Sequence, residues 1–195
     1  LLPQGVLRMV VLFWVRVGYR LKSHHEDRVP KNEGVLLLPN HVSYVDTLIL
    51  GAASKRDLRF VMLDSLYETP RWKWDFKAFG TVPISAERAR EAIKTVAKAL
   101  QEDQAVVLFS EGQLTRTGFS NSIRKGYELM ARLGKSKIQI VWIDGLWHSI
   151  FAFKDGHAIR KTPQRVPLGV QVLFGPVLEV EEATPWRIRL EWMKL

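Results

Sequence analysis

The sequence contains no cysteine among its 195 residues, which excludes a disulfide-stapled scaffold, a thiol nucleophile and thiolate-bound metal sites. It also lacks a long uncharged apolar run. The longest run near the N-terminus, residues 9–15, is far shorter than the roughly 20 residues of a membrane-spanning helix. Acidic residues are scarce, 20 against 29 Lys and Arg, so the formal charge is +9. This excess of cations indicates an anionic partner: a nucleic acid, a membrane surface or a phosphate-bearing substrate.

The residues that are present indicate a folded protein. Hydrophobic residues make up 47% of the chain, which excludes a disordered tail, and its length suits one domain. The sequence starts at Leu1 without an initiator methionine, so we expect a piece excised from a longer multidomain chain.

The first 22 residues read as a basic amphipathic helix that lies in a membrane interface. Arg8, Arg16 and Arg20 fall on one stripe of a helix, and Trp14 lies among the apolar residues that cover much of the remaining surface. The alternative is a helix that packs on the domain by one face. We divide the chain into this helix, 1–22, and a domain over 23–195.

Apolar runs and amphipathic stretches alternate through the rest of the chain. The sequence predicts strands at 35–39, 59–63, 81–84, 105–109, 138–143 and 166–174, and helices at 43–54, 86–101 and 121–133. Ser43 is expected to cap the first of these helices, with Asp46 in a capping-box position. This alternation predicts a single-domain α/β fold with a mostly buried central sheet flanked by helices.

One candidate chemical segment, Asn40 to Asp46, directly follows a predicted strand, where ligands collect in α/β proteins. Asp46 can turn back to His41 and hold one ring nitrogen, which leaves the other nitrogen as a general base for a hydroxyl. On spacing alone, the favoured interpretation is that Asp46 simply caps the helix and that His41 is a loop residue.

The second candidate segment runs from Phe109 to Gly118 at the end of another predicted strand. Its Ser-Glu-Gly turn exposes backbone N–H groups, and Thr115 and Arg116 add donors that suit a phosphate or an oxyanion. The segment is neither a nucleophile elbow nor a phosphate-binding P-loop, because both glycine frames are missing. Alone, it predicts either an anion site or an ordinary turn.

Two motifs together resemble the glycerolipid acyltransferase superfamily over about residues 35–174: Asn40-His41 separated by four residues from Asp46, and Phe109-Ser110-Glu111-Gly112. The resemblance implies that His41 is the base and Asp46 its orienting carboxylate, with no metal and no cofactor. An acyl thioester, on acyl carrier protein (ACP) or coenzyme A (CoA), would be the co-substrate. It further implies a bacterial enzyme at the cytoplasmic face of the inner membrane, with a backbone oxyanion site near Gly112. The expected substrate-binding residues are Asn40, Ser43, Glu111, Gly112, Thr115 and Arg116, and the expected acyl-chain or membrane contacts are Trp14, Trp72 and Trp74.

Two departures refine the resemblance. Ser85 and Ala86 stand where the family's second motif ends in Asp-Arg, and the third motif continues Gln113-Leu-Thr-Arg-Thr-Gly. These variants are similar to the acyltransferase part of the bifunctional 2-acylglycerophosphoethanolamine acyltransferase/acyl-ACP synthetases, in which ligase or transporter-like domains adjoin it. The predicted acceptor is therefore the free hydroxyl of a lysophosphatidylethanolamine-type lipid in phospholipid remodelling, with lysophosphatidic acid as the alternative.

Other features have weaker interpretations. His24, His25, Glu26 and Asp27 are adjacent in sequence, which rarely closes a metal site. A basic run reads either as a solvated face or as a surface for anionic headgroups or an acyl carrier protein; it comprises Arg116, Arg124, Lys125, Arg132, Lys135 and Lys137. A nucleic-acid-binding module is disfavoured because no such signature is present. A catalytically silent membrane-binding domain remains a further alternative.

Overall fold

The computed structural model describes residues 4–63, 82–84, 89–158, 162 and 166–195. Its helices are α1 (Gln4–Gly18), α2 (Asp46–Ala53), α5 (Ala89–Gln101), α6 (Gly126–Gly134) and α7 (Pro185–Lys194). Short 3-10 turns lie at η1 (Glu26–Arg28), η2 (Leu146–His148) and η3 (Lys154–Gly156). The strands are β1 (Leu21–His24), β2 (Val35–Pro39), β3 (Leu58–Leu63), β4 (Val82–Ile84), β5 (Ala105–Val107), β6 (Lys137–Asp144) and β7 (Val170–Leu178).

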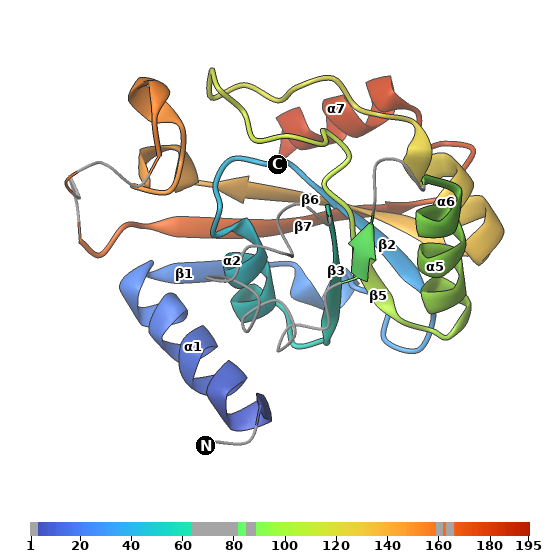
Figure 1. Cartoon of the computed structure of the whole chain (residues 1–195), viewed down its shortest axis with the longest axis horizontal. Coiled ribbons are helices and arrows are strands. Elements are labelled where there is room, and N and C mark those ends of the chain that lie inside the picture. Colours follow the sequence, from blue (N-terminus) through green and yellow to red (C-terminus); the bar gives the residue numbers. More distant parts are fainter. Residues whose placement is uncertain (1–3, 64–81, 85–88, 159–161, 163–165) are drawn as a thin grey trace.

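The strands of the described residues form one mixed sheet in the order β1-β7-β6-β2-β5-β3-β4 (Figure 1). β2 lies at its centre and pairs in parallel with both β5 and β6, whereas β7 runs antiparallel to β6. The carboxyl ends of β2, β5 and β6 therefore meet at one edge of the sheet. The predicted α/β fold with a central sheet and flanking helices is confirmed.

The central strand β2 is buried on both faces, as its unbroken apolar run predicts. Because side chains alternate along a strand, Val35 and Leu37 pack on the side of α1 and α2, and Leu36 and Leu38 on the side of α5, α6 and α7. All four side chains are 0% exposed, and each contributes about 1.5–3 kcal/mol of hydrophobic stabilisation. This two-sided core gives the loops at the carboxyl edge a rigid base.

The helix predicted at 43–54 starts later, and Ser43 is not its cap. α2 begins at Asp46, and its N-cap is Val45, which makes no side-chain capping bond. The main-chain N–H groups of Val42 and Ser43 both donate to Oδ2 of Asp46, at 2.7 and 3.0 Å. The carboxylate thus winds the preceding residues into a turn, and this turn replaces the first helical turn that the capping pattern predicted.

Two other predicted elements are shifted along the chain. The helix predicted at 121–133 begins only at Gly126, because the main-chain N–H groups of Asn121 and Arg124 bond back to Glu111 and Ser110. The strand predicted at 166–174 is β7, which begins at Val170 and runs to Leu178. The loop between β5 and α6 is therefore longer than expected. Its second part, at Asn121 and Arg124, is bonded to its first part, at Ser110 and Glu111.

The two ends of the chain differ from the prediction. α1 ends at Gly18, and residues 21–24 form the edge strand β1, whereas the sequence predicted a helix that continues to residue 22. α7 was missed. The sequence carries a local signal for this helix. Thr184 is its N-cap and accepts a hydrogen bond from the N–H of Arg187, and Pro185 lies in the first turn.

Several predicted features lie outside the described residues: Trp72, Trp74, Ser85 and Ala86. The strand predicted at 81–84 is described as β4 from Val82. No helix in the described part of the chain is long and apolar enough to cross a membrane.

Candidate active site

His41 and Asp46 form a hydrogen-bonded pair at the carboxyl end of β2. Nδ1 of His41 lies 2.8 Å from Oδ2 of Asp46. Because an ionised carboxylate only accepts hydrogen bonds, Nδ1 carries the proton and Nε2 of a neutral ring keeps a lone pair. The pair that the family resemblance implied is therefore assembled, with the free nitrogen that general-base chemistry needs.

Local structure holds Asp46 in this position. Its side chain is fully buried, and Oδ2 accepts from the N–H groups of Val42 and Ser43 as well as from the imidazole. A buried carboxylate is costly unless such donors surround it. The same three bonds that offset this cost fix the carboxylate against the ring of His41.

Phe109, which follows β5, covers one face of His41. The ring centroids are 3.9 Å apart, and the planes are inclined by 21°. The imidazole side chain is 21% exposed. Phe109 thus holds the ring from one side and leaves a limited opening through which a substrate can approach.

Glu111 joins the two predicted segments. Its side chain is buried, Oε1 accepts from the N–H of His41 at 2.9 Å, and Oε2 accepts from the N–H of Asn121. Burial raises the pKa of Glu111, and the two backbone hydrogen bonds oppose that rise by stabilising the charged form. The carboxylate therefore holds the main chain of the site together.

Three other predicted substrate-site residues, Asn40, Thr115 and Gly112, use their polar groups in hydrogen bonds within the protein. The side-chain amide of Asn40 donates to the carbonyl of Ile143 and accepts from its N–H, at 3.0 and 2.7 Å, which ties the loop to β6. The hydroxyl of Thr115 donates to the carbonyl of Phe119 at 2.6 Å. The N–H of Gly112, near which we expected an oxyanion site, donates to the carbonyl of Phe109 at 3.0 Å.

Ser43 and Arg116 meet a loop that the sequence did not single out. Ser43 forms a β-bridge with Ala152, which places Phe153 beside the site. The guanidinium carbon of Arg116 lies 3.5 Å from the centre of the Phe153 ring, and Tyr44 packs against the same ring at 5.8 Å. No periodic or motif signal marks Phe153; only the tertiary bridge brings it here.

The comparisons with known proteins agree with this geometry. The family described as Acyltransferase matches residues 20–144, which include His41, Asp46 and Glu111. The chain belongs to the Acyltransferase family. The predicted membership of the acyltransferase superfamily is thereby confirmed, and with it the prediction of an acyltransferase at the level of the family.

A curated relative of this acyltransferase is the 1-acyl-sn-glycerol-3-phosphate acyltransferase of Bacillus subtilis (strain 168). It is 25% identical over 121 residues, and the match covers 60% of this chain and 59% of that protein. The chain is also similar in structure to the 1-acyl-sn-glycerophosphate (LPA) acyltransferase PlsC from Thermotoga maritima. That likeness has a TM-score of 0.68 and 17% identity, and it covers 98% of this chain and 74% of the other, which supports the fold.

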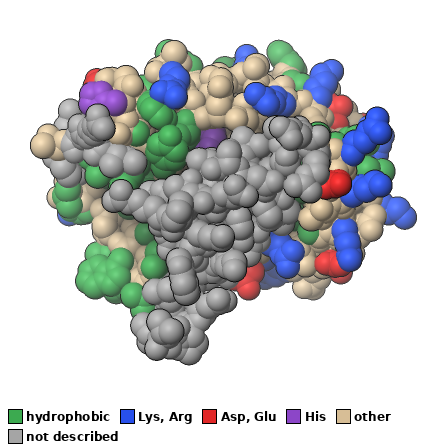
Figure 2. Space-filling view, in the orientation of Figure 1, with side chains coloured by type: hydrophobic (Ala, Val, Ile, Leu, Met, Phe, Trp, Pro, Cys, Tyr) green, Lys and Arg blue, Asp and Glu red, His purple; other side chains and the backbone are tan. Residues whose placement is uncertain are grey.

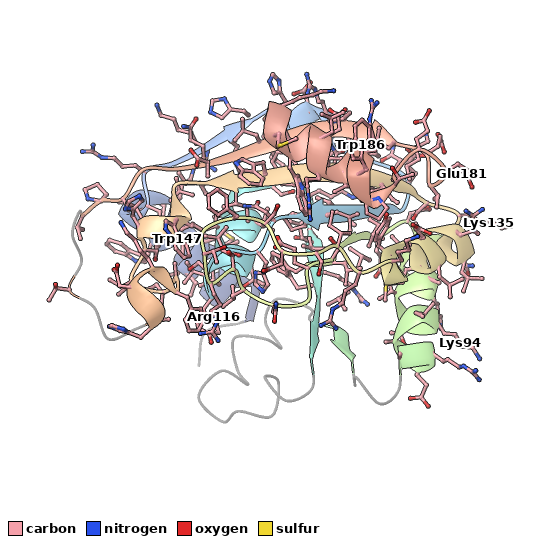
Figure 3. All side chains as sticks on the ribbon, turned by 90° about the horizontal axis from the view of Figure 1, so that it is seen from above. Lys94, Arg116, Lys135, Trp147, Glu181 and Trp186 are labelled. Carbon is pink, nitrogen blue, oxygen red and sulfur yellow. The ribbon has the colours of Figure 1, made fainter. Side chains whose placement is uncertain are left out.

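The predicted basic run of the acyltransferase does not form one surface. Arg116 lies beside η3, whereas Lys135 lies at the opposite end of the molecule (Figure 3). There Arg132 pairs with Glu181 at 2.8 Å, and Lys137 lies 3.6 Å from Glu33. The cations near the site and those at the far end must therefore be considered separately.

Helix α1 uses only one of its apolar faces for packing. Val11, Leu12 and Val15 pack on the core, and Arg16 donates to the carbonyl of Ala52 in α2. An outer apolar face remains exposed and gathers over α1 in the space-filling view (Figure 2); it comprises Met9, Val10, Phe13, Trp14 and Val17. Beside it, an apolar groove of about 470 Å³ runs between α1 and the 148–151 segment, lined among others by Trp14, Phe151 and Leu168.

The histidines at the start of the domain make separate contacts. His24 lies 3.0 Å from the side-chain oxygen of Gln171, and Glu26 pairs with Lys55. Within the described ranges, no three His, Asp or Glu side chains are arranged to hold a metal ion.

Proposed function

We propose that this protein transfers a fatty acyl group from a thioester to the free hydroxyl of a 1-acylglycerol 3-phosphate, that is, lysophosphatidic acid. The observation that carries the proposal is the bond from Nδ1 of His41 to the buried carboxylate of Asp46, which leaves Nε2 as a base. The similarity to a curated enzyme named for this reaction supports the choice of acceptor.

The proposed reaction is a direct transfer. Nε2 of His41 takes the proton from the glycerol hydroxyl as its oxygen attacks the thioester carbonyl carbon. The tetrahedral intermediate collapses, the carbon–sulfur bond breaks, and the imidazolium returns the proton to the leaving thiolate. Asp46 stabilises the imidazolium between these steps, and a positioned base of this kind contributes about 10²–10⁴-fold to the rate.

A lysophosphatidylethanolamine-type acceptor is the second candidate. It is favoured by Ser85 and Ala86, which stand in place of the Asp-Arg pair of the family's second motif. A phosphodiester headgroup carries less negative charge than the phosphomonoester of lysophosphatidic acid, so it needs fewer cations. Acceptor preference at equal concentration distinguishes the two candidates.

The proposed donor is a thioester of acyl carrier protein or of coenzyme A. Both donors carry phosphate or carboxylate groups, and the exposed Arg116 beside Phe153 is complementary to them in charge. Assays with each donor, under the same acceptor, decide between them.

We also propose that the protein acts at the cytoplasmic face of the inner membrane, held by α1. The outer apolar face of α1, including Phe13 and Trp14, is suited to the interface between lipid headgroups and acyl chains. The groove beside Trp14 and Phe151 offers an adjoining apolar path for a lipid chain. Neighbouring ligase or transporter-like domains would reinforce this attachment.

The test is acyl transfer by the purified protein from labelled acyl-CoA and acyl-ACP to lysophosphatidic acid and to lysophosphatidylethanolamine. We expect His41→Ala and Asp46→Asn to lower kcat by about 10²–10⁴-fold. The matched control His157→Ala alters an exposed histidine and should retain wild-type turnover. Background turnover by the wild type with every donor and acceptor would refute the proposal.

A further inference from the structure

Arg124 lies flat across Gly112, beside the site. A Cβ atom built on Gly112 would lie 2.9 Å from Nε and 3.0 Å from Cζ of Arg124. Gly112 also has a φ of +69°, a left-handed conformation that other residues rarely adopt. The glycine therefore serves two purposes: it makes the turn after Glu111, and it leaves room for a guanidinium group on the main chain.

Main-chain contacts fix the start of this side chain. The N–H of Arg124 donates to the carbonyl of Ser110 at 2.9 Å. The N–H of Asn121 bonds to Oε2 of Glu111, and the guanidinium of Arg189 donates to the carbonyl of Asn121 at 3.1 Å. The segment that carries Arg124 is thus fastened to the segment that carries Glu111, which itself bonds the main chain of His41.

The charge of Arg124 is available to a ligand. Among the described residues, no carboxylate lies within ion-pairing distance of its guanidinium, and the nearby carboxylate of Glu111 is occupied by two main-chain N–H groups. Arg132 and Arg187, by contrast, pair with Glu181 and Glu191. An exposed arginine that rests on the main chain of Gly112, one residue after the Glu111 that bonds His41, is suited to bind an anion.

We infer that Arg124 binds the phosphate of the acceptor lipid. The inference rests on the proposed function, since in that acceptor the phosphate is on the carbon next to the one bearing the attacking hydroxyl. A cation for it must therefore lie close to His41, and Arg124 is attached to the loop whose Glu111 holds His41. A guanidinium fork binds two phosphate oxygens at once, which also fixes the orientation of the acceptor.

Arg116, the other arginine of this loop, is engaged differently. Its guanidinium is stacked on Phe153, which restricts its direction, whereas Arg124 lies along Gly112. The rival explanation is that Arg124 only packs on the glycine and stabilises the loop. A structural role predicts a loss of stability or of kcat, whereas phosphate binding predicts a change in KM for acceptors that carry a phosphate.

The experiment compares Arg124→Gln with Lys125→Gln in the whole chain. Both residues are exposed neighbours, and both substitutions remove one positive charge. KM and kcat are measured for lysophosphatidic acid and for a monoacylglycerol of the same chain, which lacks phosphate. We expect Arg124→Gln to raise KM for lysophosphatidic acid roughly 10- to 100-fold, with kcat and monoacylglycerol turnover unchanged. Lys125→Gln should change KM less than about three-fold, and Arg124→Lys should restore part of the affinity.

A direct binding arm separates this inference from the proposed function. Binding of lysophosphatidic acid, without any acyl donor, is measured by titration with the wild type and both variants, each shown to be folded by its thermal unfolding. Weaker binding for Arg124→Gln alone supports the inference, even if the wild type transfers no acyl group. Equal lysophosphatidic acid binding by Arg124→Gln and Lys125→Gln, or an equal loss with monoacylglycerol, overturns it.

Discussion

The main-chain N–H of His41 donates a 2.9 Å hydrogen bond to Oε1 of Glu111, which lies 70 residues further along the chain. The second oxygen of the same carboxylate accepts from the N–H of Asn121. A buried glutamate whose two oxygens both accept from backbone N–H groups has a structural role. Glu111 therefore contributes to the reaction by holding the main chain of His41 in place.

Replacing Glu111 by Gln should lower kcat/KM for acyl transfer by about 10- to 100-fold, because the new amide N–H₂ faces one of the two backbone donors. The thermal midpoint should fall as well. The control is Glu182→Gln, which alters an exposed glutamate. A wild-type kcat/KM for Glu111→Gln would show that the two backbone hydrogen bonds of Glu111 are not needed for activity.

Two glycine variants separate backbone strain from the placement of Arg124. Gly112 and Gly156 both have positive φ, +69° and +84°, and only Gly112 has a side chain against it. Each change to Ala should cost about 1–2 kcal/mol of stability. Only Gly112→Ala should also raise KM for a phosphate-bearing acceptor, because its methyl group displaces the guanidinium. Equal acceptor KM values in the two variants would contradict this.

Phe153 should act as a positioning residue for Arg116. Replacing it by Leu removes the ring beneath the guanidinium, a contact of about 0.5–1 kcal/mol, and should raise the KM for the acyl donor about two- to five-fold with kcat unchanged. Phe153→Tyr keeps the aromatic face and should restore the affinity. The control is Phe119→Leu, since Phe119 is 79% exposed. If Phe119→Leu raises the KM for the acyl donor as much as Phe153→Leu does, the contact between Arg116 and Phe153 is not specific.

The outer face of α1 should carry membrane binding. Trp14 and Trp186 are similarly exposed, 65% and 70%, but lie on α1 and α7. In co-sedimentation with vesicles containing phosphatidylglycerol, Trp14→Glu should weaken membrane partitioning about ten-fold or more. The substitution places a charge where an apolar ring would insert into the lipid interface. Trp186→Glu should have little effect. Similar losses in both variants would point to a less specific attachment.

Tyr127 should make stability fall at alkaline pH. Its hydroxyl donates to the carbonyl of Ala183 at 2.5 Å, and burial, reinforced by Glu128, raises its pKa above the ordinary value of 10.0. The unfolded chain loses this proton above about pH 10 while the folded chain keeps it, so stability falls as pH rises beyond 10.

The test uses Tyr127→Phe. The variant should be less stable than the wild type by about 0.5–1.5 kcal/mol at pH 8, since the bond to Ala183 is lost. This difference in stability should narrow above pH 10. Only the wild-type chain has a tyrosine at position 127 that ionises on unfolding, so only the wild type loses stability through it. Urea unfolding at pH 8 to 11 measures both effects. A constant difference in the free energy of unfolding across this range would mean that the pKa of Tyr127 is the same in the folded and unfolded chain.

Much of the fold was predictable because its signals are local. The strand at Val35–Pro39 is an unbroken apolar run between turns, and α5 follows a helical periodicity. The pairing of His41 with Asp46 followed from the family resemblance, because their spacing alone favoured a simple helix cap. The start of α2 was not predictable, since Asp46 attracts the N–H groups of Val42 and Ser43 and displaces the expected cap. Likewise, α6 begins late because Glu111 and Ser110 capture the segment before it.

The sequence by itself determined the α/β alternation, the acyltransferase motifs and the excess of positive charge. Only the tertiary structure decided where that charge lies. Arg116 stacks on Phe153 and Arg124 rests on Gly112. Lys135 lies at the far end of the molecule, where Arg132 pairs with Glu181 (Figure 3). The reason is physical. Periodicity and spacing encode contacts within a few residues, whereas the parallel pairing of β2 with β5 and β6 determines which distant loops meet at the carboxyl edge of the sheet.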